Sequence, residues 1–166
     1  MNKTTIESLI YCPKIITAKP KKAMYQDQRN NYTMRNDFSC ASLDNKNTFE
    51  VFMRLNTEIA TCFSIGLRYN SEEGAVTICR YNGKHPHRNK IGDKNEFNSY
   101  HVHMLYDHQL TSDLSDSLDA IETNKYLTFH EALHAFLNDC QIQKWDEYFP
   151  DLEDKVSQLT LGMGGF

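Results

Sequence analysis

The feature that most constrains the fold is a series of segments in which apolar and polar side chains alternate. Residues 62–70 show the alternation well, because Phe63, Ile65 and Leu67 are separated by small or polar residues. A period of two is typical of a strand with one buried face. The same pattern recurs in residues 49–56, 75–82 and 97–106, and more weakly in residues 37–43.

Short links join most of these segments. Residues 44–47 and 71–74 are rich in Asp, Asn, Ser and Gly, which favour tight turns. Such links are too short for the crossover that parallel strands need, so successive strands should pair antiparallel. The sequence therefore predicts an antiparallel meander of about five strands.

Helical spacing follows the alternating segments. In residues 128–140 apolar side chains recur at helical spacing, and Thr128 with Glu131 three residues later fits a capping box. Leucines in residues 110–121 recur at a similar spacing among aspartates, which indicates a shorter acidic helix. We therefore expect an α+β fold in which one or two C-terminal helices pack on the sheet.

The first part of the chain shows less order. After a short helix predicted at residues 4–10, residues 12–35 are polar and basic, and Pro13 and Pro20 interrupt regular structure. We predict an irregular basic arm over residues 1–36, a single α+β domain over residues 37–160 and a flexible tail over residues 161–166.

Composition places the chain among folded globular proteins, because 40% of its 166 residues are hydrophobic. No apolar run approaches the about 20 residues of a membrane-spanning helix, and the first residues lack the apolar core of a signal peptide. The five cysteines are widely spaced, odd in number and without a C-x-x-C pair. We expect a cytoplasmic protein with free thiols and no membrane partner.

Charge is distributed unevenly along the chain. Residues 1–106 hold 15 Lys and Arg against 10 Asp and Glu, a net charge of +5, whereas residues 107–166 hold 3 against 12, a net charge of −9. Such a chain can present a basic face to nucleic acid and an acidic face to a basic protein. The alternative is that the acidic part is only a solvated helical surface.

Histidines gather in one stretch of the chain. In residues 97–106 Val102 and Met104 alternate with His101 and His103, so we expect both histidines on the face of a strand away from the main apolar core. The preceding loop should bring His85 or His87 within reach of them. The alternative is that these are ordinary surface histidines on a solvated strand face.

Two kinds of chemistry fit this histidine group. His85, His87, His101 and His103 could hold zinc, or His101, His103 and His87 could act without metal as acid and base on a phosphodiester. The phosphate would then be held by basic residues of the same stretch, Arg80, Lys84, Arg88 and Lys90.

A second motif lies in the predicted helix of residues 128–140. His130, Glu131 and His134 form H-E-x-x-H, in which the histidines bind zinc and the glutamate acts as general base in peptidases. A catalytic zinc also needs a third protein ligand. Glu153 or Asp154 is available for that role, although neither belongs to a ligand motif.

Several motifs resemble a family of small bacterial and phage domains of unknown function. They are Arg-Asn-Asp-Phe at 35–38, Phe-Ser-Ile-Gly-Leu at 63–67, Asn-Gly-Lys-His-Pro-His-Arg-Asn at 82–89 and Tyr-His-Val-His at 100–103, followed by a helix like that at 129–137. The resemblance implies a Lys-rich arm, an antiparallel sheet, a histidine loop and a C-terminal helix. It implies no activity, and it implies an acidic residue where this chain has His130, so that H-E-x-x-H would arise by chance.

Three functions therefore stay open. The first is a zinc-binding or ribonuclease-like protein of a phage or mobile element, with nucleic acid as partner. The second is a small zinc peptidase that uses H-E-x-x-H. The third is an inhibitor without enzymatic activity, which binds a host or nucleic-acid-processing protein through the acidic residues 107–154.

Overall fold

The alternating segments form one antiparallel sheet. The computed structural model describes residues 3–86, 98–105 and 119–162, with the side chains of residues 6–86, 98–105 and 120–158. Within this part of the chain eight strands form the sheet, in the order β1-β3-β4-β5-β6-β7-β8, with β2 also paired to β3. The strands are β1 (Lys14–Ala18), β2 (Tyr25–Asp27), β3 (Asn30–Ser42), β4 (Thr48–Asn56), β5 (Phe63–Ser71), β6 (Gly74–Asn82), β7 (His101–Met104) and β8 (Asp119–Glu122).

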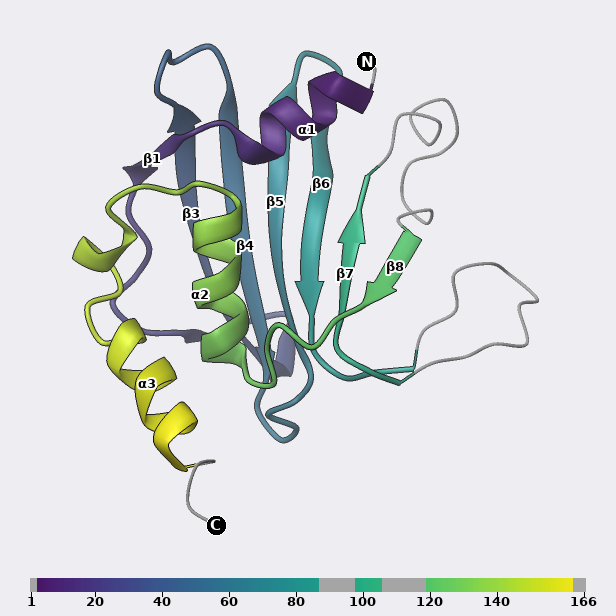
Figure 1. The fold of residues 1–166 in the computed structure, drawn as a ribbon, viewed down its shortest axis with the longest axis vertical. Helices are drawn as coiled ribbons and strands as arrows, with labels where there is room; N and C mark the ends of the chain where they lie inside the picture. The colour runs from purple at the N-terminus through teal and green to yellow at the C-terminus, as the bar shows by residue number, and fades with distance from the viewer. Residues whose placement is uncertain (1–2, 87–97, 106–118, 163–166) are drawn as a thin grey trace.

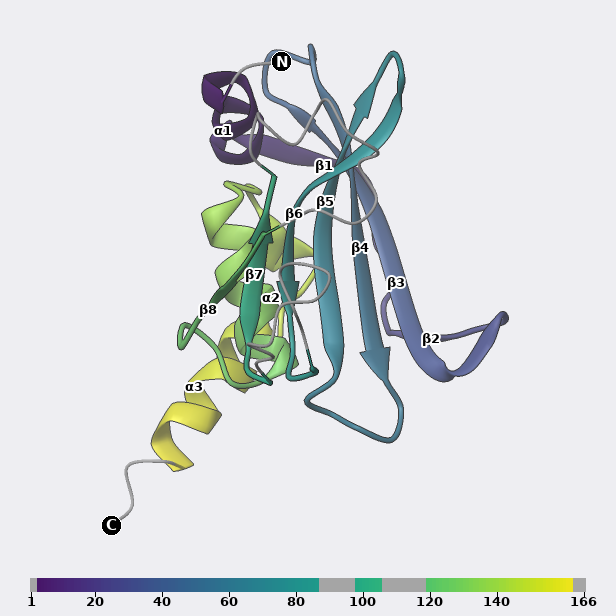
Figure 2. The same ribbon diagram turned by 90° about the vertical axis from the view of Figure 1, so that its right-hand side faces the viewer.

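The helices lie on one side of this sheet, and the other side carries no helix of the described residues (Figures 1 and 2). They are α1 (Lys3–Tyr11), α2 (Phe129–Asp139), the short 3-10 helix η2 (Trp145–Glu147) and α3 (Leu152–Gly162). Thr128 caps α2, because its side chain accepts a hydrogen bond from the amide of Glu131. The capping box in the sequence therefore predicts where α2 begins.

The apolar core lies between the sheet and the helices. Strand side chains such as Val51, Ile65 and Leu67 are fully buried, as are Phe136 and Leu137 of α2. Each strand sends alternate side chains to the opposite side of the sheet, which we call the open face. The α+β class and the antiparallel meander from β3 to β7 are as the sequence predicts, but the sheet is larger than five strands, because β1, β2 and β8 also belong to it.

The N-terminal region differs most from the prediction of an irregular arm over residues 1–36. It forms α1, β1, β2 and the first half of β3, all joined to the sheet or its core. Pro13 and Pro20 flank β1, an edge strand, where proline costs no ladder hydrogen bond. Lys14 is fully buried. Its ammonium group donates hydrogen bonds to the carbonyls of Ile10, Cys12 and Cys140, which offset the loss of hydration.

Two further predictions concern the C-terminal third of the chain. The acidic helix predicted at residues 110–121 is wrong at its end, since residues 119–122 form β8, where Val102 pairs with Ile121. Residues 106–118 lie outside the described part. The helix α3 extends to Gly162, into the segment predicted as a flexible tail. The pairing with β7 thus decides the conformation of residues 119–122, and the packing of Leu152 in the core anchors α3. Both contacts override the weak local patterns of the sequence.

None of the helices in the described residues has the length and apolar character that crossing a membrane requires. All five cysteines are free thiols, in agreement with the sequence prediction. Cys79 and Cys140 lie closest, with sulfur atoms 3.7 Å apart in the core.

Candidate functional site

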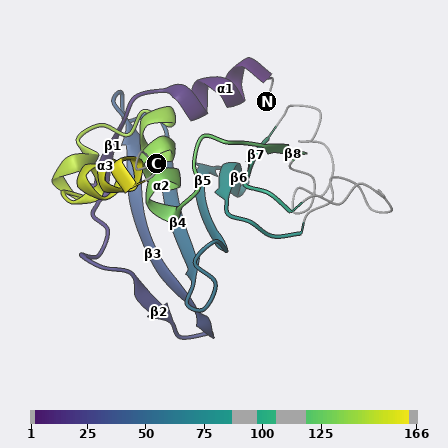
Figure 3. The same cartoon turned by 60° about the horizontal axis from the view of Figure 1, so that its bottom comes forward.

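The pairing of β6 with β7 decides where the strand histidines point. Val102 and Met104 lie opposite Tyr81 and Cys79, two residues of the helix-side core. His101 and His103 therefore share the open face, as the alternation predicts, at the end of the sheet away from β2 and β3 (Figure 3).

These histidines are buried, which contradicts the alternative of a solvated strand face. His101 is 0% exposed and His103 is 1% exposed. The ring centroid of His101 lies 5.0 Å from that of His103 and 4.7 Å from that of His85. The structure thus brings three of the four predicted histidines together, and the fourth, His87, lies outside the described residues.

Hydrogen bonds fix the imidazole of His101. Its Nδ1 lies 2.8 Å from the carbonyl oxygen of Ser99, so Nδ1 carries the proton and donates. Its Nε2 then accepts from the side-chain amide of Asn82 at 3.2 Å, and the Asn82 oxygen accepts from the hydroxyl of Ser64 at 2.7 Å. The hydroxyl of Tyr126 ties the same strands together by donating to the backbone carbonyls of Asn82 and His101. Both nitrogens of His101 are therefore engaged, which suits a positioning residue.

Arg80 is the unusual cation of this region. It pairs with His103 across β6 and β7, so both side chains lie on the open face. Burial lowers the pKa of its guanidinium. Its buried Nε has no hydrogen-bond acceptor among the described residues. None of the ion pairs within the described ranges includes Arg80. A desolvated cation without an acidic partner is costly, which favours an anion at this position.

A cavity of about 310 Å³ lies beside Arg80 on the open face. Its polar lining includes Arg54, Ser64, Arg80, Asn82 and His85. We call it the Arg80 cavity. Its volume lies at the lower end of the range for small-molecule sites, about 300–1,000 Å³. Arg54 was not singled out in the sequence, because it lies on β4 and reaches the cavity only through strand pairing.

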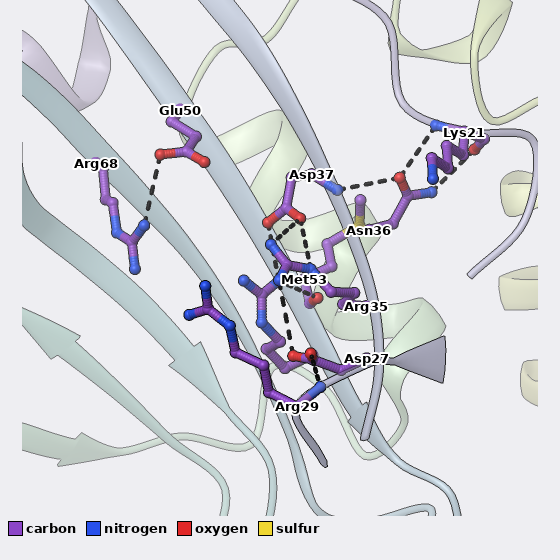
Figure 4. Close-up of polar contacts among 10 residues, drawn as sticks. Lys21, Asp27, Arg29, Arg35, Asn36, Asp37, Glu50, Met53 and Arg68 are labelled. Atoms are coloured by element: carbon purple, nitrogen blue, oxygen red, sulfur yellow. Dashed lines mark hydrogen bonds and ion pairs between the residues drawn. The ribbon is translucent and has the colours of Figure 1, made fainter. Parts of the chain in front are cut away.

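More arginines continue from the cavity over the open face (Figure 4). Asp37 of β3 accepts from Arg54 at 2.8 Å and from Arg35 at 2.8 Å, so one carboxylate serves two guanidinium groups. The hydrogen bonds with Asp37 raise the pKa of Arg35, which stays fully charged. Arg68 lies 3.5 Å from Glu50. Arg35 also lies 3.7 Å from Asp27, so these three arginines face three carboxylates.

The other predicted phosphate ligands contribute less to the described site. Lys84 is exposed and does not line the Arg80 cavity, although its backbone amide donates to the carbonyl of Thr61. Arg88 and Lys90 lie outside the described residues.

No group of three or more His, Cys, Asp or Glu residues in the described ranges is arranged to hold a metal ion. The four-histidine zinc site includes His87, which lies outside those ranges, so zinc binding there stays a prediction. The half-buried Arg80 beside His103 acts against a dication, because like charges repel more strongly where water is partly excluded.

The residues of H-E-x-x-H have structural contacts on α2. A carboxylate oxygen of Glu131 accepts from the amide of Leu127 at 2.8 Å, next to the helix cap. The ring of His134 packs against Trp145 with centroids 5.3 Å apart, and the ring of His130 packs against Phe129. Glu153 and Asp154 are exposed on α3 and complete no metal group. These contacts favour a structural role for the motif.

Exposed acidic residues lie on η2 and α3 and in the link between them, away from the open face; they are Asp146, Glu147, Asp151, Glu153 and Asp154. Asp113 and Asp116, the centre of the acidic surface predicted for an inhibitor, lie outside the described residues. That function therefore stays a prediction.

Comparisons of the chain with protein-family models, with curated proteins and with solved structures found no match. The resemblance to a bacterial and phage family therefore stays a prediction too. Fold and site define the chain only as an α+β protein with a buried histidine group and an arginine-lined cavity on the open face of its sheet.

Proposed function

We propose that the protein binds a phosphate group of RNA in the Arg80 cavity and cleaves the adjacent phosphodiester bond without a metal ion. The observation that carries this proposal is Arg80, a desolvated guanidinium without a described acidic partner in the wall of a polar cavity. Guanidinium groups bind phosphate oxygens in a bidentate manner. Arg54 lies in the same wall, so two cations can face one anion.

His85 is the imidazole placed to exchange a proton with a bound substrate. It lines the cavity and is partly exposed, whereas His101 and His103 are fully buried. His101 contacts the ring of His85 and is itself fixed by Ser99 and Asn82, so it orients His85 rather than reacting. This division of roles differs from the acid–base set that the sequence predicts, His101, His103 and His87, because it adds His85 as the base and makes His101 a positioning residue.

The reaction that suits such a site is attack by the ribose 2′-hydroxyl on the neighbouring phosphorus. The proton of that hydroxyl passes to the imidazole of His85, and the new oxygen–phosphorus bond replaces the bond to the 5′-oxygen. The leaving 5′-oxygen takes a proton from a second group, for which the sequence offers His87, since the buried His103 does not line the cavity. The products are a 2′,3′-cyclic phosphate and a 5′-hydroxyl, and Arg80 with Arg54 offsets the charge that develops on phosphorus oxygens.

The test uses a short DNA strand with one ribonucleotide. We expect cleavage at the ribonucleotide in the presence of a chelator, and none when that 2′-hydroxyl is replaced by hydrogen. His85→Ala should abolish cleavage but keep binding. Arg80→Gln should weaken binding roughly 10- to 100-fold, because a charge-assisted hydrogen bond contributes about 1.5–3 kcal/mol.

The matched control is Lys155→Gln, which removes an exposed positive charge on α3, on the other side of the sheet. The proposal would be refuted if the Arg80→Gln protein bound and cleaved the substrate as well as this control. Metal analysis of untagged protein separates it from the zinc hypothesis: stoichiometric zinc that His101→Ala removes would favour zinc.

A further inference from the structure

The open face carries a continuous line of polar and aromatic side chains across the sheet. Successive strand pairings place Tyr25 opposite Arg35, Arg35 opposite Arg54, Arg54 opposite Ser64, Ser64 opposite Asn82, and Asn82 opposite His101. Directly paired residues point to the same face. With strands about 4.8 Å apart, the line extends about 24 Å from the histidine group to β2.

The ring of Phe52 and the guanidinium groups of Arg54 and Arg68 form a platform beside this line. Phe52 pairs with Gly66 across β4 and β5, and its ring lies over that glycine so closely that a Cβ atom there would clash with it. The guanidinium carbons of Arg68 and Arg54 lie 4.8 Å and 5.6 Å from the centre of the ring. Arginines on an aromatic ring present planar, charged surfaces on which bases stack well.

The platform and the residues around it carry a net positive charge, and the arginine side chains are partly exposed. Four arginines and three carboxylates lie here; they are Arg29, Arg35, Arg54 and Arg68, and Asp27, Asp37 and Glu50. Arg80 adds a further positive charge. The side chains of Arg35, Arg54 and Arg68 keep 29%, 25% and 38% of their surface exposed. Figure 4 shows the arginines grouped around the carboxylates. A phosphate backbone complements such a surface although the whole chain is acidic.

We propose that a single-stranded RNA lies across the strands on this platform, so that one of its phosphates enters the Arg80 cavity. This inference rests on the proposed function and names the form of its substrate. A single strand fits because its unstacked bases can pack on the guanidinium planes while its phosphates contact Arg35 and Arg54. The bases of a duplex are stacked on one another and offer no such contact.

The experiment compares a ribodinucleotide with a single-stranded RNA of eight nucleotides by fluorescence anisotropy. The octamer should bind at least about tenfold more tightly, since it makes further charge-assisted contacts outside the cavity. Arg68→Gln and Arg35→Gln, neither of which lines the cavity, should each remove most of this gain. Cleavage of the dinucleotide should not change in Arg68→Gln, and Lys155→Gln should retain the full gain.

The outcomes separate the two proposals. Equal affinity for dinucleotide and octamer, or Arg68→Gln and Arg35→Gln proteins as tight as the Lys155→Gln control, would overturn the platform and leave the cavity intact. Binding of an RNA duplex as tightly as the single strand would also overturn it. A protein that binds neither RNA would overturn both proposals. Melting temperatures of the variants show that each is folded, so that lost affinity is not lost structure.

Discussion

Replacing Lys14 by methionine should strongly destabilise the protein. The ammonium group of Lys14 is buried and lies 2.7 Å from the carbonyl oxygen of Ile10, 2.8 Å from that of Cys12 and 3.1 Å from that of Cys140. Two of these carbonyls belong to the C-terminal ends of α1 and α2, where backbone carbonyls lack helical partners and a cation is favourable. The side chain of Lys14 thus caps the C-terminal ends of two helices and fixes β1 between them.

The magnitude follows from these contacts. Methionine has a similar length and keeps the packing, but it leaves two buried carbonyls and one partly buried carbonyl without their charged donor. Each such hydrogen bond contributes about 1.5–3 kcal/mol, and the desolvation of the ammonium offsets part of the sum. We expect the free energy of unfolding to fall by about 3–5 kcal/mol.

Urea unfolding measures this loss. With a denaturant slope of about 2 kcal/mol/M, the midpoint should fall by about 1.5–2.5 M. Lys19→Met is the control, because Lys19 is exposed and its replacement should change stability by less than about 0.5 kcal/mol. A Lys14→Met midpoint within about 0.5 M of the natural protein would show that the buried ammonium contributes no net stability, and the reasoning would be refuted.

Three further predictions concern other elements. Gly66→Ala should lower the melting temperature by roughly 2–10 °C, because the new methyl group displaces the ring of Phe52; an unchanged melting temperature would contradict the close approach. Thr128→Ala should reduce the free energy of unfolding by about 1 kcal/mol through loss of the cap on α2, and a neutral effect in urea titration would argue against the cap. Burial, and secondarily Lys155, lowers the pKa of His130 below its ordinary value. The unfolded chain therefore binds the proton first as the pH falls, and stability decreases below about pH 6.5; His130→Gln should flatten that decrease in urea midpoints measured from about pH 7.5 to about pH 5.

The sequence predicts the central strands well, because their alternation is a local property. Phe63, Ile65 and Leu67 mark β5 without knowledge of any neighbour, and Val102 against His101 gives the correct faces of β7. Thr128 and Glu131 likewise mark the start of α2. The short β1 and β2 and the strand β8 are missed, since pairing partners rather than their own residues decide their conformation.

The candidate site divides in the same way. The histidine stretch is visible in the sequence, because its members are close along the chain. Arg54 and Arg80 meet only through the register of β4, β5 and β6, which no single segment encodes. The sequence likewise shows that His101 points away from the apolar core, but not that it is buried and fixed by Asn82.

Lys14 shows the limit most clearly. In the sequence it is one of several lysines in a basic stretch, and lysine is rarely buried. Its hydrogen bond to Cys140 joins residues 126 positions apart. The sequence by itself determined which side chains of β5, β7 and α2 face the core, since periodicity needs only neighbouring residues. Tertiary structure alone decided which polar groups meet, because those contacts depend on register and on helix ends brought together from distant parts of the chain.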